Sequence, residues 1–362
     1  MKICMLADAG SIHTIRWCKH FYEKGHDVHI ITFNKNASIN GIKMHFVDAG
    51  KISVSGGNWR VILRYRKIKK IIASLQPDIV HSIYATSYGL MGALSGFQPY
   101  IITPLGTDIL ISPKTSFLYK LLLRYTFKKA DWITSMAPHM TQALLHLGAS
   151  KEKIGDLIFG VNTEIFNKKN RQLSTTEFVI VSTRNFEPVY NIPHFLRSIE
   201  LIKRKIPNLK VLMVGDGTLK QELIELTKEL RIDSIVTFLG KVPQSKVVEV
   251  LNSANIFVTV SLSDGNSLSL IEAMACGAYP IATDIIANHE WITDGMNGSF
   301  VKIDDVTGLA GKIQHVYSNF DKIISQAIPE SDRIIAEKGK WQTNMRRMEN
   351  KYNELNASRK KL

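Results

Sequence analysis

The amino-acid sequence predicts an α/β protein with two Rossmann-like, doubly wound domains that face each other across a cleft. The chain has 362 residues, and at about 100–200 residues per domain this length suggests two domains. Short apolar runs alternate with segments of helical periodicity, which is typical of parallel sheets whose strands are joined by helices. The alternation stops at a polar stretch, residues 167–176, and then starts again.

The first half contains six apolar runs that are predicted to be strands. These runs cover residues 2–8, 27–33, 44–47, 78–84, 100–104 and 132–135. Segments with helical periodicity lie between them, at residues 13–24, 59–75, 116–128 and 138–147. Gly25 directly follows the first of these helices, which is a common way for a helix to end.

The second half repeats the pattern. Its predicted strands cover residues 178–183, 210–214, 236–239, 256–260, 279–282 and 299–303, and its helices cover residues 194–205, 219–230, 244–252, 267–276 and 306–318. A final helix is expected at about residues 331–355. We therefore expect an N-terminal domain (1–165), a C-terminal domain (166–330) and a C-terminal helix (331–362) that packs back towards the N-terminal domain.

Composition excludes several classes of protein. With 45% hydrophobic and 22% charged residues, the chain is an ordinary globular protein and not a disordered one. No apolar window approaches the roughly 18 residues of a membrane-spanning helix, and the N-terminus lacks a signal-peptide pattern. Cys4, Cys18 and Cys276 are widely separated, which argues against disulfides or a zinc site and favours the reducing cytoplasm.

Positive charge is concentrated in the first half. The chain has 46 Lys and Arg against 32 Asp and Glu, a net charge of +14, and residues 1–165 account for +10 of it. Six cations lie between Arg60 and Lys70, and residues 117–129 mix cations with large apolar side chains. Such helices suit an anionic membrane surface, although each could equally be a solvated helix with its apolar side in the core. Nucleic acid is disfavoured because no recognised binding motif accompanies the charge.

The segment from Ser263 to Gly277 is the most informative candidate site. A predicted strand ends near Val260, a loop of Gly and small polar residues follows, and a helix begins near Ser267. The free N–H groups at the start of that helix suit an anion such as phosphate. Asp264 in the loop and Glu272 in the helix could accept hydrogen bonds from sugar hydroxyls. Alternatively, Asp264 caps the helix and Glu272 is a solvated helix residue.

Asp264 and Glu272 resemble the acidic-x7-Glu motif of retaining glycosyltransferases with the GT-B fold, particularly glycosyltransferase family 4. The run 272–284 is similar to the most recognisable stretch of that family. Weaker similarities follow one another along almost the whole chain, at residues 106–108, 160–166, 178–184 and 214–217.

This resemblance implies a donor site that holds a UDP- or GDP-linked sugar as co-substrate, with no cofactor. Arg184 would bind the donor diphosphate, Glu272 would hold the nucleotide ribose, and Asp264 would contact the transferred sugar. These three are the candidate catalytic residues. Further donor contacts are expected from Gly215, Gly265, Asn266, Ser267 and Leu268. The alternative for Arg184 is a surface arginine at a strand end.

The implied reaction is hexosyl transfer with retention at the anomeric carbon and without a metal. Asp304 and Asp305 open a helix, where capping explains them better than metal binding.

The sequence departs from the family at the position five residues after Arg184. A Lys is usual there, but this chain has Val189, followed by Tyr190. One positive charge on the leaving diphosphate is therefore missing, and losing such a group commonly costs about 3–4 kcal/mol.

The acceptor is expected against the first domain, at the ends of its strands. Gly10, Ser11 and His13 follow the first predicted strand, His81 lies near the end of the fourth, and Asp108 follows the fifth. His13 could instead be an ordinary helix residue and His81 a core histidine.

The leading hypothesis is a cytoplasmic enzyme on the inner face of the membrane. It would transfer a sugar to a lipid-linked or saccharide acceptor in the synthesis of a surface polysaccharide such as O-antigen, capsule or lipopolysaccharide. One alternative is a sugar-nucleotide epimerase or hydrolase of the same architecture. Another is a non-catalytic nucleotide-sugar-binding subunit, which Val189 motivates. An oxidoreductase is disfavoured because no Gly-x-Gly-x-x-Gly follows Asp8 or Thr183.

Overall fold

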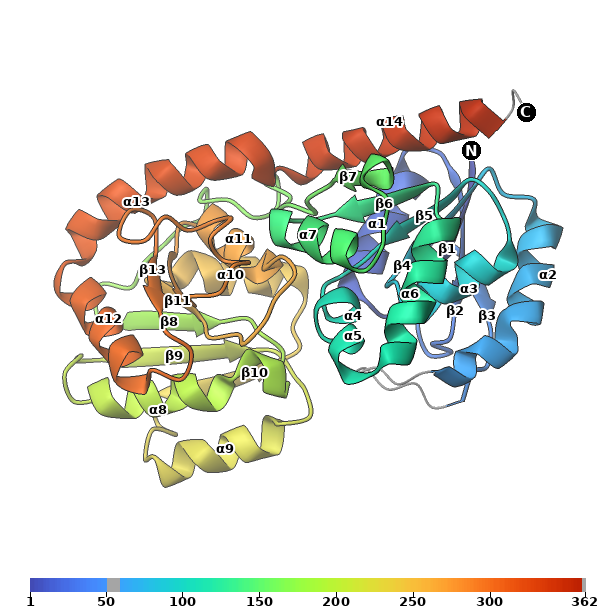
Figure 1. Cartoon of the computed structure of the whole chain (residues 1–362). Coiled ribbons are helices and arrows are strands. Elements are labelled where there is room, and N and C mark those ends of the chain that lie inside the picture. The colour runs from blue at the N-terminus through green and yellow to red at the C-terminus, as the bar shows by residue number, and fades with distance from the viewer. Residues whose placement is uncertain (51–58, 360–362) are drawn as a thin grey trace. The chain divides into compact units, whose positions relative to one another are not determined.

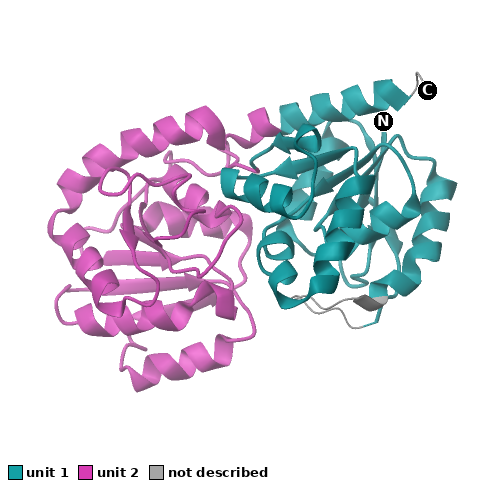
Figure 2. Ribbon diagram, in the orientation of Figure 1, with its two compact units in different colours: residues 1–158, 345–362 teal, residues 159–344 magenta. Residues whose placement is uncertain are grey.

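The computed structural model describes residues 1–50 and 59–359. The sequence ends in a basic run, residues 359–361, of which Lys360 and Lys361 lie outside these ranges. The chain divides into two compact units, residues 1–158 with 345–362 (unit 1) and residues 159–344 (unit 2), as Figure 2 shows. Among the helices of the described ranges, none is both long and apolar enough to cross a membrane.

Unit 1 is built on a seven-stranded parallel sheet with the order β3-β2-β1-β4-β5-β6-β7 (Figure 1). The order reverses between β1 and β4, and in such sheets ligands bind outside the carboxyl ends of the strands at this switch point. The strands are β1 (Lys2–Leu6), β2 (Asp27–Thr32), β3 (Lys43–Phe46), β4 (Ile79–Ile83), β5 (Tyr100–Thr103), β6 (Trp132–Ser135) and β7 (Ile154–Asp156).

The helices of unit 1 include one that the sequence pattern does not predict, α3. Nearly all of its residues are buried, so it lacks the polar face that marks an amphipathic helix. It packs against α2 and α6, and a Cβ at Gly92 would lie 2.3 Å from the ring of Tyr100. The helical segments are α1 (Ile12–Glu23), η1 (Trp59–Arg64), α2 (Tyr65–Leu75), α3 (Tyr88–Ser95), α4 (Thr107–Leu110), α5 (Ser112–Thr115), α6 (Phe117–Lys129), α7 (Pro138–His146) and η2 (Lys151–Lys153).

Unit 2 is built on a six-stranded parallel sheet with the order β10-β9-β8-β11-β12-β13, which reverses between β8 and β11 (Figure 1). Helix α8 packs against α9 and α12, and α11 packs against α13. The strands are β8 (Phe178–Ser182), β9 (Leu209–Val214), β10 (Val236–Gly240), β11 (Ile256–Thr259), β12 (Tyr279–Thr283) and β13 (Ser299–Val301). The helical segments are η3 (Pro188–Tyr190), α8 (Ile192–Ile202), α9 (Lys220–Glu229), α10 (Gln244–Ser253), α11 (Leu268–Ala275), α12 (Val306–Ser318), α13 (Phe320–Ile334), η4 (Ile335–Gly339) and α14 (Trp341–Arg359).

The predicted fold class, two Rossmann-like units with parallel sheets, is confirmed. Each of the twelve predicted strands corresponds to an observed strand, with ends that differ by at most two residues. Strand β7 was not predicted, because its three residues are exposed or only half-buried and give no apolar run. The apolar runs therefore identified twelve of the strands, including the edge strands β3 and β10, and missed only this short polar strand among those described.

The prediction of one continuous helix at residues 331–355 is wrong. Helix α13 ends at Ile334, the π-helical turn η4 follows, and α14 begins at Trp341. The N–H of Val161 donates to the carbonyl of Gly339 at 2.7 Å, so this carbonyl takes a partner outside the helix. Gly160 allows the approach, because a Cβ there would lie 2.3 Å from the same carbonyl oxygen. From Met345 onward, α14 belongs to unit 1.

Candidate functional site

The switch point of the unit 2 sheet brings together the main residues predicted for the donor site. Arg184 follows β8, and Asp264 lies in the loop between β11 and α11. These two strands are neighbours in the sheet although about 80 residues separate the two side chains in sequence. Parallel strands end at the same edge, so the loops that follow them meet there.

Arg184 is held by three side chains from the loop and the first turn of α11. Its guanidinium donates to Asp264 Oδ2 at 2.6 Å, to Ser269 Oγ at 2.8 Å and to Ser267 Oγ at 3.3 Å. The Arg184 and Asp264 side chains are only 9% and 15% exposed. A charge-assisted bond in such a site is strong, so Arg184 has a defined orientation and is not a mobile surface arginine.

Tyr190 completes the surroundings of Arg184, and sequence reasoning did not identify it as a site residue. The Arg184 guanidinium lies 4.1 Å from the centre of the Tyr190 ring, in the range of a cation–π contact. The neighbouring Val189 carbonyl accepts a hydrogen bond from the N–H of Leu262 at 2.8 Å, which ties η3 to the loop after β11. At the two positions where the family usually has Lys and Gly, this chain has Val189, whose carbonyl bonds to Leu262, and Tyr190, whose ring contacts Arg184.

Several polar atoms at this sheet edge are buried without a hydrogen-bond partner: Arg184 Nε, Thr183 Oγ1 and Asn266 Nδ2. The other amide atom of Asn266 accepts from Trp291 Nε1 at 2.9 Å, which orients the amide. Ser267 is the N-cap of α11 but its side chain does not cap the helix. Unsatisfied buried groups are rare in native proteins, and an anion at the helix N-terminus would be a suitable partner.

The predicted donor residue Gly215 brings the turn after β9 against the turn after β8. It has a φ of 147°, and a Cβ there would lie 2.5 Å from the carbonyl oxygen of Arg184. The N–H of Phe186 donates to the carbonyl of Asp216 at 3.1 Å. Gly215 thus supports the backbone that carries Arg184. Of the other predicted donor residues, Gly265 is buried in the loop and Leu268 is the first residue of α11.

Glu272 lies three residues after Ser269 on α11 and is partly exposed. Its negative charge acts on Cys276, one turn further along the helix. Burial is the main reason that the pKa of Cys276 is raised to about 12, and the charge of Glu272 raises it further, while Arg171 opposes the shift. The structure therefore places a carboxylate on the same helix whose first turn holds Arg184.

In unit 1, Gly10, Ser11 and His13 lie together after β1, at the carboxyl edge of the sheet. The N–H of Gly10 donates to Asp8 Oδ1 at 2.9 Å, and Asn34 Nδ2 donates to the same oxygen at 3.0 Å. Ser11 is the N-cap of α1 but makes no side-chain cap bond. His13 lies in the first turn of α1 and is partly exposed.

His81 is buried in the core, away from the exposed edge where it was expected. Its Nε2 bonds to Thr103 Oγ1 at 2.7 Å, and its Nδ1 bonds to the hydroxyl of Tyr352 on α14. Burial lowers the pKa of His81 to about 3, so the ring is neutral near pH 7. It connects β4 to α14, and both of its nitrogens are in use.

Asp108 is also completely buried. It accepts hydrogen bonds from the N–H groups of Ala85 at 2.6 Å, Gly106 at 2.9 Å and Leu105 at 3.1 Å. Burial raises the pKa of Asp108, and these N–H donors partly offset that rise. Asp108 thus joins the turns after β4 and β5, and its oxygens are taken by the protein's own backbone.

We expect the free energy of unfolding to decrease as the pH falls from His81's ordinary pKa of 6.5 towards its folded value of about 3. Unfolded His81 takes up a proton in this range while the buried ring does not, so protons favour the unfolded state. One such group contributes at most about 1.4 kcal/mol per pH unit. Urea unfolding of the wild type and His81→Asn at several pH values measures this, and the variant should show the flatter dependence. Equal slopes would contradict the assignment.

Asp305 caps α12, because its Oδ1 accepts from the N–H of Gly308 at 2.7 Å. This agrees with the capping role that was predicted for the Asp304-Asp305 pair. Within residues 1–50 and 59–359, no three His, Cys, Asp or Glu side chains form a group that could hold a metal ion.

Two Rossmann-like units, each built on a parallel sheet, form the architecture that the GT-B glycosyltransferases share. Family models match both halves of the chain: "Glycosyl transferase 4-like" over residues 2–137 and "Glycosyl transferases group 1" over residues 163–333. The chain belongs to glycosyltransferase family 4.

Curated relatives are similar over most of the chain. N-acetyl-alpha-D-glucosaminyl L-malate synthase of Bacillus anthracis is 25% identical, over 88% of this chain and 89% of the relative. The N-acetylgalactosamine-N,N'-diacetylbacillosaminyl-diphospho-undecaprenol 4-alpha-N-acetylgalactosaminyltransferase of Campylobacter jejuni is also 25% identical, over 77% of this chain and 79% of the relative.

Solved structures show the same fold. Sucrose-phosphate synthase from Thermosynechococcus elongatus superposes with a TM-score of 0.84 at 17% identity, covering 99% of this chain and 100% of that one. HepE of Anabaena, in complex with UDP and glucose, superposes with a TM-score of 0.80 at 16% identity, covering 98% and 100%. The chain therefore has the GT-B fold, and the family models identify it as a glycosyltransferase.

Proposed function

We propose that this glycosyltransferase moves a hexose from a UDP- or GDP-linked donor to a lipid-linked or saccharide acceptor, with retention at the anomeric carbon and without a metal ion. The main observation that supports this donor site is the position of Arg184 at the switch point of the unit 2 sheet. Arg184 is oriented by Asp264 and Ser269 and faces the uncapped start of α11. The HepE structures, which contain UDP or UDP-glucose, support a nucleotide-sugar donor.

In the proposed reaction the bond between the anomeric carbon and the diphosphate breaks, and a bond from that carbon to the acceptor oxygen forms. The acceptor's hydroxyl proton passes to an oxygen of the leaving diphosphate on the same face of the sugar. Arg184 stabilises the charge that develops on the diphosphate. Glu272 accepts hydrogen bonds from the ribose, and Asp264 both orients Arg184 and contacts the sugar.

We place the acceptor against unit 1, at the edge formed by Gly10, Ser11 and His13. The buried positions of His81 and Asp108 make them supports of this unit. A lipid-linked acceptor is supported by the Campylobacter relative, whose name includes a diphospho-undecaprenol substrate. Synthesis of a surface polysaccharide is the process we propose for this reaction.

Membrane association of the enzyme at the cytoplasmic face is supported by α6. Four of its apolar side chains are exposed and share one face: Phe117 (69%), Leu118 (57%), Leu121 (45%) and Tyr125 (38%). We call these four residues the α6 stripe. Cations flank it at Lys120, Arg124, Lys128 and Lys129. An exposed apolar face flanked by Lys and Arg is typical of helices that lie in a membrane interface.

The second basic helix, α2, has a different character. Its apolar residues Ile68 and Ile72 are buried, while Lys67, Lys69 and Lys70 are exposed to solvent. This is the arrangement of an ordinary amphipathic helix that covers a core. We therefore assign the membrane contact to α6, and α2 adds positive charge without an apolar surface.

We expect Glu272→Gln to weaken binding of the nucleotide-sugar donor about tenfold or more, because hydrogen bonds to a charged group contribute about 1.5–3 kcal/mol. Thermal-shift screening of UDP- and GDP-sugars identifies the donor, and calorimetry with the wild type and the variant measures the change. Glu229→Gln is the matched control, because Glu229 is an exposed residue of α9, and this variant should bind the donor normally.

Transfer to membrane-extracted lipid acceptors then tests the reaction itself. Consumption of the donor without an acceptor would indicate an epimerase or hydrolase. Donor binding without any turnover would indicate a non-catalytic subunit. Full affinity in Glu272→Gln would contradict the donor site.

A further inference from the structure

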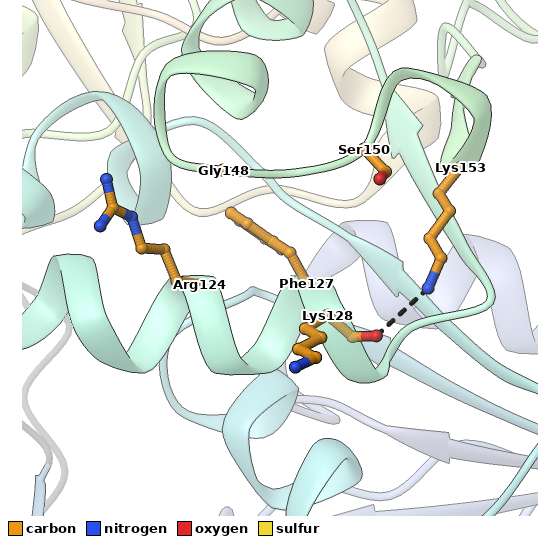
Figure 3. A pocket seen from close by; sticks show the side chains of 6 residues that line it. All are labelled: Arg124, Phe127, Lys128, Gly148, Ser150 and Lys153. Carbon is orange, nitrogen blue, oxygen red and sulfur yellow. Dashed lines mark hydrogen bonds between the residues drawn. The ribbon is translucent and has the colours of Figure 1, made fainter.

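A hollow of about 400 Å³ in unit 1 lies between the second half of α6 and the turn that leads into β7 (Figure 3). It is formed entirely within unit 1, on a segment that the donor and acceptor sites do not use. Its lining residues are Arg124, Phe127, Lys128, Gly148, Ser150 and Lys153.

The hollow is basic, and hydrogen bonds hold Lys153 in place. Lys153 Nζ donates to the carbonyls of Lys128 at 3.1 Å and Ala130 at 2.7 Å. Figure 3 shows the bond to Lys128. An ammonium has three donors, so one remains. Arg124 lies across Gly148, where a Cβ would come within 3.2 Å of the arginine Cγ. Gly148 therefore leaves the space into which the Arg124 side chain extends.

Acidic residues offset only part of this charge. Among the described residues, no carboxylate forms an ion pair with Arg124, Lys128 or Lys153. Glu152 is the carboxylate next to the hollow, and it is fully exposed. Hydrogen bonds from its own backbone N–H and from the Ser150 hydroxyl lower the pKa of Glu152, and the charge of Lys153 lowers it further. The hollow therefore has three cations against one nearby carboxylate and is adapted to an anion.

The position of the hollow beside the α6 stripe indicates which kind of anion it binds. Arg124 and Lys128 lie one turn apart on α6, and the side chains of the α6 stripe lie beside them on the same helix. A free anion would need no neighbouring apolar surface. An anionic phospholipid has both parts, a phosphate for the cations and acyl chains for the exposed Leu and Phe side chains.

We propose that this hollow binds the phosphate headgroup of an anionic phospholipid, with Arg124, Lys128 and Lys153 as its ligands. The proposal rests on the membrane association proposed for α6. The bound headgroup fixes how deeply and in which orientation α6 sits in the interface. The stripe supplies general membrane affinity, and the hollow supplies selectivity for anionic lipid.

The test uses the full chain and two kinds of vesicle, phosphatidylcholine alone and phosphatidylcholine mixed with phosphatidylglycerol. Arg124→Gln/Lys128→Gln should lose roughly tenfold or more of the affinity for the anionic vesicles, since each cation near such a surface contributes about 1 kcal/mol. Lys19→Gln/Lys24→Gln removes the same charge from α1 and its C-cap, and should bind almost as well as the wild type. Ser150→Trp fills the hollow without changing the charge and should also weaken binding.

Dihexanoyl phosphatidylglycerol below its micelle concentration separates the hollow from the stripe. Leu118→Ser/Leu121→Ser should lose binding to both vesicles but keep binding of this soluble lipid. Equal losses in the α6 and α1 charge variants, or normal binding by Ser150→Trp, would overturn the hollow and indicate diffuse charge. Inorganic phosphate that competes as well as the lipid would overturn the lipid assignment. Wild-type protein that binds neither vesicle would contradict the membrane association itself. Far-UV circular dichroism and urea unfolding check that every variant is folded.

Discussion

Arg184→Ala is expected to lower kcat/KM for sugar transfer by roughly 10²–10³-fold, the usual effect of removing one oriented donor to a developing negative charge. Arg184 is buried, ion-paired with Asp264 and stacked on Tyr190. These contacts come from the protein's own side chains, and they orient the guanidinium towards the start of α11. The loss should appear mainly in kcat, because the charge on the diphosphate grows in the transition state.

Arg184→Lys tests whether shape matters as well as charge. A lysine keeps the positive charge but cannot reach Asp264 and Ser269 together or stack as a plane on Tyr190, so most of the activity should still be lost. Arg204→Ala, on an exposed segment after α8, is the matched control. Steady-state rates with the identified donor measure all three variants, and an Arg184→Ala enzyme with wild-type kcat would remove Arg184 from the catalytic site.

Gly215→Val is expected to abolish donor binding and to destabilise the protein by about 2 kcal/mol or more. The φ of 147° is unfavourable for any residue with a Cβ, and that Cβ would overlap the carbonyl oxygen of Arg184, 2.5 Å away. The turns after β8 and β9 must therefore separate, and Arg184 moves with its turn. Urea unfolding and calorimetry with UDP measure the two effects.

Gly311→Ala is the control for this change. Gly311 lies exposed in α12 with open space around it, so alanine should stabilise the protein by about 0.5–1 kcal/mol and leave UDP binding intact. Wild-type UDP affinity in Gly215→Val would show that the contact with Arg184 is not needed for the donor site.

Local patterns in the sequence were sufficient for the fold class and for the outline of the donor site. The strands were found because a parallel strand covered on both faces needs an apolar run, whatever its neighbours are. Gly-rich loops before a helix likewise have a local signature, which is why the loop at Gly265 and Asn266 was identified. The same reasoning missed α3, since a helix buried on all sides has no polar face to give it a period.

Contacts between distant segments could not be read from such patterns. Nothing local distinguishes His81, whose Tyr352 partner lies 271 residues away, from a histidine at a binding edge. The periodicity of residues 331–355 continues through Gly339, and only the approach of Val161 interrupts the helix there. Ser269 became a site residue because β11 is the neighbour of β8 in the sheet, which brings the first turn of α11 beside Arg184. Tyr190 lies in the same connection between β8 and α8 as Arg184, and its contact with Arg184 depends on how that connection turns.

The basic segments that contribute to the net charge of +10 on residues 1–165 illustrate what the sequence determines and what the tertiary structure decides. The sequence by itself determined that two basic segments would form helices, because helical periodicity depends only on nearby residues. The sequence left open, for each of the two helices, whether its apolar side is buried in the core or exposed to solvent. The tertiary structure decided this, burying Ile68 and Ile72 of α2 and leaving Phe117 and Leu118 of α6 exposed, because burial depends on what the rest of the chain packs against each face.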